Sequence, residues 1–302
     1  MHANHPDIHS RRKTISGYLY AALAAVLWSL IAPLSKNALA AGISPVETSF
    51  WRALLGCLCF AVQTSLTGGL RVPVRHALIF ILFGGWGVSI LFSALQLSIQ
   101  LSGAATAMVL LYTAPAWVAV ASYFLFREAI SAKKIIAICV ALTGAILVSF
   151  SGGSLPTGYS TLGIICGLIS GLAYASHFPF YVWWYGRYST ATIYTYMLFG
   201  GALFLLPFVD FAPAKSWDTW GNLVALAFLT NYLAYLAIAK SLQLISQVQS
   251  AVIGNIEPVL ATLLVWAFFG ENFNIYGWIG CTLVICAVFL LTLERKPSET
   301  KR

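Results

Sequence analysis

Ten long apolar runs follow one another along this chain. A bilayer core about 30 Å thick requires roughly 20 apolar residues in a helix, which rises about 1.5 Å per residue. Only 9% of the residues are charged, whereas a soluble domain is typically about a quarter charged. The sequence therefore predicts an all-α integral membrane protein with ten transmembrane helices. The expected spans are 17–38, 45–67, 76–97, 103–126, 132–150, 160–183, 189–209, 219–240, 247–269 and 274–293.

The positions of the basic residues predict the orientation of the chain. Lys and Arg are enriched in the short cytoplasmic connections of membrane proteins. Placing the N-terminus in the cytoplasm leaves only Lys36 and Lys215 on the outer side. We therefore expect both termini on the cytoplasmic side of a bacterial inner membrane. The net charge of +8 then reflects topology, and no nucleic-acid partner is expected.

The two halves of the chain repeat each other. Aligning the second half on the first places Pro258 on Pro115 and Glu271 on Glu128. Five spans per half is an odd number, so the second half enters the membrane from the opposite side. Inverted repeats place the substrate site near the midplane, where the halves meet around a central cavity. We divide the chain into a cytoplasmic tail (1–16), a first five-helix repeat (17–150), a linker (151–159), a second five-helix repeat (160–293) and a second cytoplasmic tail (294–302).

Two matched motifs, together with the early stretch WSLIAPLSK, carry a resemblance to a known family: TAPAWVAVASYFLFREAIS and IEPVLATLLVWAFFGENFN. Over about 17–293 the sequence resembles the drug/metabolite transporter superfamily, in its ten-helix EamA-type branch. The aromatic-rich composition is similar to that of the YddG-type exporters of aromatic amino acids. The resemblance implies export of small metabolites through a central cavity lined by the first, third, fourth, sixth, eighth and ninth helices.

Glu257 is the only acid deep inside an expected span. Such a group is costly in lipid and usually faces a cavity or a partner, so two interpretations stay open. Glu257 is either a protonatable or substrate-facing group, or a neutral or paired residue that ties helices together. Asn255 is two residues earlier, about 200° away around a regular helix, so we expect only one of the two to face substrate. Asn255 is the preferred candidate, because Tyr112 is its polar counterpart in the first half.

Aromatic side chains supply most of the other candidates. Tyr174 and His177 share one helix face with Phe178 and Tyr181, although such a stripe is also typical of simple packing. Aromatic walls suit a flat apolar side chain. The expected substrate-binding residues are Trp28, Ser89, Tyr112, Tyr174, His177, Tyr232, Tyr235 and Asn255. Proline interrupts helices, so kinks or moving hinges are expected at Pro33, Pro115, Pro179 and Pro258.

Arg52 lies in the outer part of the second span, near Glu47. We favour an ion pair with Glu47, or snorkelling to the surface, over a clamp for a substrate carboxylate. Lys240 ends the eighth span on the inside. The expected spans thus offer no cation at mid-depth, which argues against a carrier of nucleotide sugars.

Enzyme and cofactor motifs are absent from the sequence: it has no HExxH, GxSxG or GxxxxGK[ST] pattern and no cluster typical of metal ligands. We therefore expect neither an enzyme nor a metal or cofactor.

The predicted function is export of small amphiphilic metabolites, aromatic or hydrophobic amino acids above all, by alternating access. A multidrug or other metabolite carrier of the same fold and a passive channel stay open. The expected partners are a small-molecule substrate and the lipid bilayer. The pattern is compatible with a monomer, but the sequence leaves the oligomeric state open.

Overall fold

The computed structural model describes residues 7–69, 71–150, 160–212, 214–269 and 274–292, and within them every regular element is helical. Glu271, the linker 151–159, residues 1–6 of the first predicted tail and the whole second predicted tail (294–302) lie outside the described residues. The helices are α1 (Asp7–Ser29), α2 (Ile31–Ala40), α3 (Pro45–Thr67), α4 (Val74–Gly84), η1 (Gly85–Ile90), α5 (Leu91–Ser102), α6 (Ala104–Leu111), α7 (Ala114–Phe126), α8 (Ala132–Ser149), α9 (Thr161–Trp184), α10 (Thr190–Leu205), η2 (Leu206–Phe208), α11 (Trp217–Ala227), η3 (Phe228–Leu233), α12 (Ala234–Leu242), α13 (Gln247–Gly254), α14 (Ile256–Phe269) and α15 (Ile275–Thr292).

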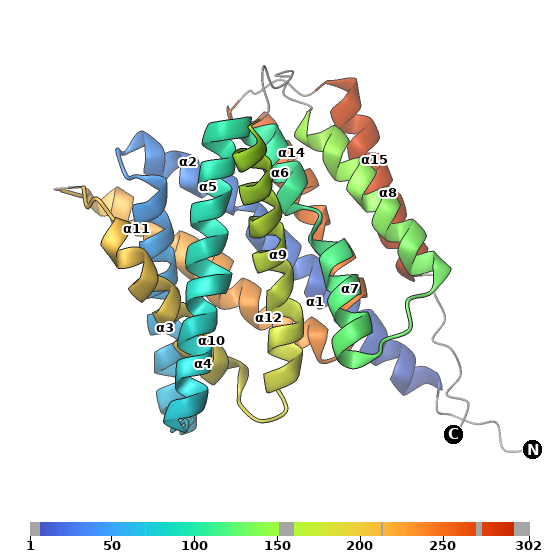
Figure 1. Ribbon diagram of the computed structural model, residues 1–302, viewed down its shortest axis with the longest axis horizontal. Helices are drawn as coiled ribbons and strands as arrows, with labels where there is room; N and C mark the ends of the chain where they lie inside the picture. Colours follow the sequence, from blue (N-terminus) through green and yellow to red (C-terminus); the bar gives the residue numbers. More distant parts are fainter. Residues whose placement is uncertain (1–6, 70, 151–159, 213, 270–273, 293–302) are drawn as a thin grey trace, which may run out of the picture.

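These elements form ten spans, which confirms the predicted fold class. Among the described residues, nine stretches are long and apolar enough to cross a membrane, and Ile275–Leu291 is a shorter apolar helix. Six spans are built from more than one element: α1 with α2, α4 with η1 and α5, α6 with α7, α10 with η2, α11 with η3 and α12, and α13 with α14. The chain therefore spans the bilayer as an all-helical bundle (Figure 1).

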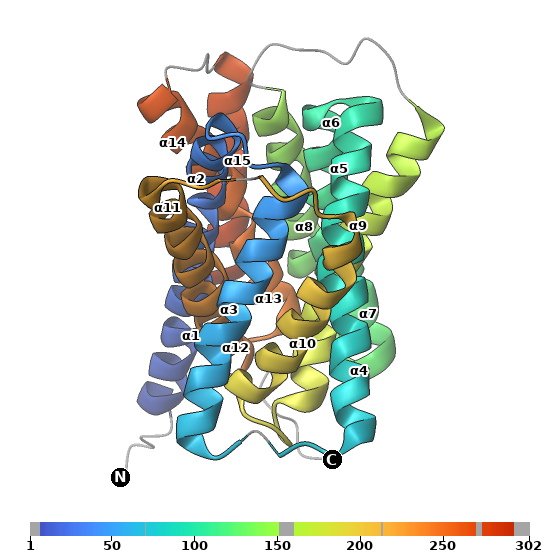
Figure 2. The same cartoon turned by 90° about the vertical axis from the view of Figure 1, so that its left-hand side faces the viewer.

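The helix contacts follow the two-fold relation between inverted halves. Equivalent helices pack against each other, α3 on α10 and α8 on α15. Non-equivalent contacts occur in reciprocal pairs: α1 packs on α12, and their counterparts α9 and α5 pack on each other. Two-fold symmetry requires such pairs. If a helix of the first half contacts a helix of the second half, the equivalent helix of the second half must contact the equivalent helix of the first. The views in Figures 1 and 2 show the halves interleaved rather than lying side by side.

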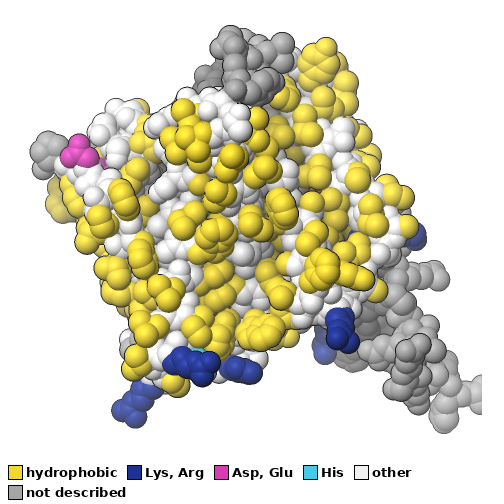
Figure 3. Space-filling model, viewed as in Figure 1, with side chains coloured by type: hydrophobic (Ala, Val, Ile, Leu, Met, Phe, Trp, Pro, Cys, Tyr) yellow, Lys and Arg dark blue, Asp and Glu magenta, His cyan; other side chains and the backbone are white. Residues whose placement is uncertain are grey.

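Charged side chains mark the two ends of the bundle differently. Lys and Arg gather along the end at which α4 begins and α9 ends, at the lower edge of Figure 3. The connections at that end carry Arg71, Arg127 and Arg187, and we call it the basic end. In Figure 3, an acidic side chain lies near the opposite end.

Glycines bring α9 close to the first half. A Cβ on Gly171 would lie 2.6 Å from the Leu110 carbonyl oxygen, and one on Gly163 would lie 2.9 Å from the Leu101 Cβ. Both distances are shorter than any ordinary contact. Small residues spaced one helical turn apart let two helices approach closely, and here they place α9 directly against α5 and α6.

Candidate functional site

Two spans are broken at equivalent depths, one in each half. α6 ends at Leu111 and α7 begins at Ala114, whereas α13 ends at Gly254 and α14 begins at Ile256. Tyr112 and Asn255 occupy the two joints, with φ/ψ of −74°/3° and −66°/1°. Proline follows each joint by three residues, at Pro115 and Pro258, and removes one helical hydrogen bond there. Broken helices at midspan are where transporters of inverted-repeat design bind their substrates.

The other two predicted prolines differ from each other. Pro33 follows a break at Leu30, where α1 ends and α2 begins. Pro179 lies inside the uninterrupted helix α9, so no break accompanies it. A gating role for any of the four prolines stays a prediction.

The break at Asn255 changes the expected choice between Asn255 and Glu257. That choice assumed one regular helix, but Glu257 lies in the first turn of a new helix, α14. The side chain of Asn255 is 3% exposed, and its Nδ2 has no hydrogen-bond partner. Glu257 is partly buried, and its charge interacts through space with Tyr112, Tyr174 and Tyr235. Glu257 therefore lies beside the aromatic candidates.

Each half also contains a π-helical segment at the same place. The alignment that pairs Pro115 with Pro258 also puts η1 (Gly85–Ile90) on η3 (Phe228–Leu233). A π-helix displaces backbone carbonyls from their usual partners and is frequent at functional sites. The indole Nε1 of Trp28 donates to the carbonyl oxygen of Thr230 at 3.1 Å. His177 Nε2 lies 2.6 Å from the carbonyl oxygen of Gly87, the repeat counterpart of Thr230.

These two hydrogen bonds are reciprocal across the halves. A carbonyl only accepts, so His177 donates from Nε2 as Trp28 donates from Nε1. Trp28 belongs to α1 of the first half and binds η3 of the second, while His177 belongs to α9 of the second half and binds η1 of the first. Each π-helix is thus held by a ring N–H from the other half.

Five aromatic rings meet between the halves, and we call them the aromatic cluster: Trp28, Tyr174, His177, Tyr194 and Tyr235. Trp28 packs edge-on against Tyr174 at 6.1 Å and Tyr235 at 6.2 Å between ring centroids. Tyr235 stacks on Tyr194 at 4.7 Å and lies 6.1 Å from His177. Four of these five residues were predicted from sequence, whereas Tyr194 was missed because the seventh span was not expected to line the site.

The remaining predicted residues lie around this cluster. Ser89 is buried in η1, where its Oγ donates to the Gly201 carbonyl oxygen at 2.9 Å. Tyr232 packs against Phe60 at 4.8 Å, on the α3 side. Tyr112 is 7% exposed at the α6–α7 joint, within electrostatic reach of Glu257. The structure thus brings Tyr112 to the cluster and directs Ser89 and Tyr232 toward neighbouring helices.

Arg52 requires a correction. Its predicted partner Glu47 instead binds Lys215, with 2.6 Å between Lys215 Nζ and Glu47 Oε1, and accepts from the Ala212 amide. Residues five apart lie about 140° apart around a helix, so Arg52 faces away from Glu47. Its guanidinium lies over the ring of Phe92, with Cζ 5.4 Å from the centroid. Arg52 is 6% exposed and interacts electrostatically with Glu257, Tyr174 and Tyr235, so a cation does lie beside the candidate site.

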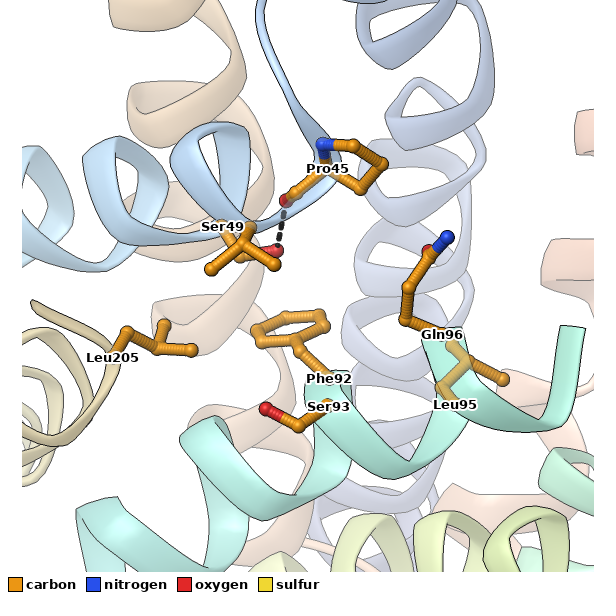
Figure 4. Close-up of a pocket in the computed structure, with 8 residues that line it drawn as sticks. Pro45, Ser49, Phe92, Ser93, Leu95, Gln96 and Leu205 are labelled. Atoms are coloured by element: carbon orange, nitrogen blue, oxygen red, sulfur yellow. Dashed lines mark hydrogen bonds between the residues drawn. The ribbon is translucent and has the colours of Figure 1, made fainter. Parts of the chain in front are cut away.

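Two openings lie toward opposite ends of the bundle. A small pocket of about 60 Å³ lies between α3, α5 and α10, away from the basic end, and is lined by Ser49, Phe92 and Gln96 among others (Figure 4). In Figure 4 the ring of Phe92 projects into the space between these helices. A larger groove of about 610 Å³ lies toward the basic end and is bounded by Leu27, Leu233 and Lys240 among others. Leu27 precedes Trp28 of the aromatic cluster in α1, and Phe92 lies under the Arg52 guanidinium, so each opening includes a neighbour of a candidate residue.

Comparison with known proteins assigns the chain to a family. A model of the EamA-like transporter family matches residues 15–150 and 161–293. The chain belongs to the EamA-like transporter family. Each match covers one five-helix half, so the inverted repeat coincides with two copies of the family's unit.

Relatives of this EamA-like chain are transporters. It is 22% identical over 292 residues to the uncharacterized transporter YdfC of Bacillus subtilis, with 94% of this chain and 93% of YdfC covered. It is 27% identical over 238 residues to the uncharacterized inner membrane transporter YicL of Salmonella typhimurium, covering 75% of each. A solved crystal structure with 20% identity superposes with a TM-score of 0.78 over 92% of this chain and 96% of that one, which supports the fold.

Across the described part of the chain, no three His, Cys, Asp or Glu side chains gather closely enough to hold an ion. The groups that the structure brings near one another are the rings of the aromatic cluster, the acid Glu257 and the guanidinium of Arg52.

The reciprocal ring hydrogen bonds give a testable expectation for this EamA-like protein. Trp28→Phe removes the N–H that binds the Thr230 carbonyl oxygen and also shortens a buried ring. We expect a loss of at least about 1 kcal/mol in unfolding free energy, since interhelical hydrogen bonds in membranes contribute about that much and the lost ring contacts add to it. His177→Phe is expected to cost a similar amount, because it breaks the equivalent bond to Gly87. Thermal unfolding in detergent measures both. Trp217→Phe is the control, because Trp217 is 90% exposed. A loss in only one of the two variants would show that the two bonds are not energetically equivalent.

Proposed function

We propose that this protein exports a small amphiphilic metabolite, an aromatic or other hydrophobic amino acid, across a bacterial inner membrane by alternating access. The basic end faces the cytoplasm in this proposal, because basic connections favour that side. The protein acts as a monomer, since the two halves of one chain surround the site.

The single observation that carries the proposal is the placement of the aromatic cluster between two matched helix joints. Trp28 and Tyr235 pack on each other, and their sequence neighbours Leu27 and Leu236 line the groove toward the basic end. Trp28 is 5% exposed and Tyr235 is 9% exposed, so neither opening reaches them freely. A carrier requires a site that each end can reach in turn, and halves of inverted design supply it by exchanging conformations. Aromatic rings in turn suit a flat apolar side chain.

A second candidate is a carrier of cationic drugs. The observation that favours it is Glu257, an acid beside Tyr112, Tyr174 and Tyr235. An acid among aromatic rings attracts organic cations through charge and through the ring faces. Proton coupling through Glu257 is compatible with both candidates.

Counterflow in proteoliposomes tests the proposal. Vesicles loaded with unlabelled phenylalanine are expected to accumulate external labelled phenylalanine transiently, with or without a pH gradient. A carrier gives this overshoot, because exchange requires a site that alternates between the two sides, and a passive channel does not. Accumulation with organic cations but not with amino acids would favour the drug carrier. No counterflow with any amino acid would contradict the proposed function.

A further inference from the structure

Arg52 is a buried cation without a counter-ion in the described chain. Its side chain lies in the membrane-spanning helix α3, and its Nε has no hydrogen-bond partner. The backbone at the same residue is held firmly, because Asn231 Nδ2 donates to the Arg52 carbonyl oxygen at 3.0 Å. The guanidinium lies over the ring of Phe92, with Cζ 5.4 Å from the ring centroid. Phe92 also lines the pocket of Figure 4, so the cation lies at the inner side of that opening.

Glu257 is an acid in the complementary situation. It lies in the first turn of α14 and forms no ion pair with any described residue. The N-terminal end of a helix carries partial positive charge, which interacts favourably with a carboxylate. Helix α14 packs on α1, the helix of Trp28. Glu257 thus lies on a helix that adjoins the aromatic cluster through α1.

Arg52 and Glu257 interact through space without touching. Each contributes to the electrostatic environment of the other, yet no nitrogen–oxygen pair between them lies within ion-pair distance among the described residues. Charges buried in a membrane protein are costly and normally pair or serve a ligand. Tyr174 and Tyr235 of the aromatic cluster interact electrostatically with both charges, and both rings pack edge-on against Trp28.

We propose that Arg52 and Glu257 form a head-group clamp for a free amino acid, with Arg52 binding the α-carboxylate and Glu257 binding the α-ammonium. This inference rests on the proposed function and names its substrate class. A guanidinium binds a carboxylate through two parallel hydrogen bonds. An ammonium group with three donors matches a carboxylate acceptor. The side chain of the substrate then packs on Trp28, Tyr174 and Tyr235.

The clamp also supplies selectivity against other amphiphiles. An organic cation would pair with Glu257 and leave Arg52 without an anion, and an organic acid would do the reverse. A ligand that leaves one of these buried charges unpaired binds much more weakly than a ligand that pairs with both. A zwitterion is the ligand that satisfies both charges at once.

Ligands that lack one head group provide the first test, which needs no substitution. Labelled phenylalanine counterflow by the full-length protein is competed with unlabelled phenylalanine, phenethylamine and 3-phenylpropanoate. We expect each truncated ligand to compete at least about tenfold less well than phenylalanine, since each leaves one charge unpaired. Equal competition by phenethylamine would overturn the clamp while leaving the export proposal intact, whereas absence of phenylalanine counterflow would overturn both.

Substitutions then assign each head group to one residue. Arg52→Gln is expected to weaken phenylalanine and 3-phenylpropanoate about tenfold and to spare phenethylamine. Glu257→Gln is expected to weaken phenylalanine and phenethylamine and to spare 3-phenylpropanoate. Binding is read from ligand-induced thermal stabilisation in detergent, so that a variant that binds but does not transport is still measured. Arg187→Gln and Glu128→Gln remove the same charges at the basic end and serve as controls.

The outcomes separate recognition from other roles. Weakening of all three ligands to the same extent in both variants would show a structural role and overturn the clamp. Unchanged ligand binding in Glu257→Gln, with altered pH dependence of transport, would assign Glu257 to proton coupling and also overturn it. If Arg52→Gln does not fold, Arg52→Lys keeps the charge but loses the paired donors, and a selective loss of carboxylate-bearing ligands remains the expected result.

Discussion

Gly200→Ala is expected to destabilise the protein by at least about 3 kcal/mol, the upper range for overpacking a close contact. Gly200 lies in α10, and a Cβ there would lie 2.7 Å from the carbonyl carbon of Ile81 in α4 and closer still to its oxygen. The reciprocal glycine, Gly84 in α4, would place its Cβ 2.7 Å from the Gly201 nitrogen. Backbone atoms cannot rotate away as side chains can. The substitution must therefore separate two helices that belong to different halves.

Thermal unfolding followed by size-exclusion chromatography in detergent measures this loss. Gly221→Ala is the matched control, because nothing lies within 4 Å of the Cβ it would add to α11. Alanine is favoured over glycine in a helix by up to about 1 kcal/mol, so the control is expected to be neutral or slightly more stable. An unchanged unfolding midpoint in Gly200→Ala would show that α4 and α10 are not packed as closely as the structure has them.

Asn255→Leu is expected to raise stability and to lower transport. Leucine has a similar size and adopts the backbone conformation at the α13–α14 joint, where φ is −66° and ψ is 1°. It removes a buried amide whose Nδ2 has no partner, and an unsatisfied group of this kind costs about 1–3 kcal/mol. If the amide instead contacts substrate during transport, its loss costs one hydrogen bond. We expect a drop of about tenfold in transport efficiency, equivalent to about 1.4 kcal/mol.

Opposite changes in the two measurements distinguish a functional residue from an ordinary packing residue. Ser122→Ala is the control, because Ser122 in α7 is also fully buried with an unpartnered Oγ. It is expected to affect stability in the same direction and to leave counterflow unchanged. Transport by Asn255→Leu equal to that of the original protein would remove Asn255 from the site.

More of the fold than of the site could be predicted from the sequence. Spans can be read from length and hydropathy, because the bilayer imposes one length on every helix. The repeat that relates Pro115 to Pro258 also relates two features that no residue pattern revealed, the π-helices η1 and η3. Trp28, Tyr174 and Tyr235 were found as candidates, because aromatic residues at mid-span stand out. Tyr194 was missed, because the resemblance did not place the seventh span among the helices that line the cavity.

The class, the ten spans and the inverted halves follow from the order of residues alone, because they depend on hydrophobic length, charge bias and internal similarity along the chain. Which charges meet depends on the three-dimensional packing of the helices. Glu47 pairs with Lys215, which lies in a loop far along the chain. Arg52 interacts electrostatically with Glu257 instead of with Glu47. Sequence neighbours on a helix share a face only at certain spacings, and contacts between helices depend on how the halves interleave. The charge pair beside the aromatic cluster is therefore a property of packing, which local sequence does not encode.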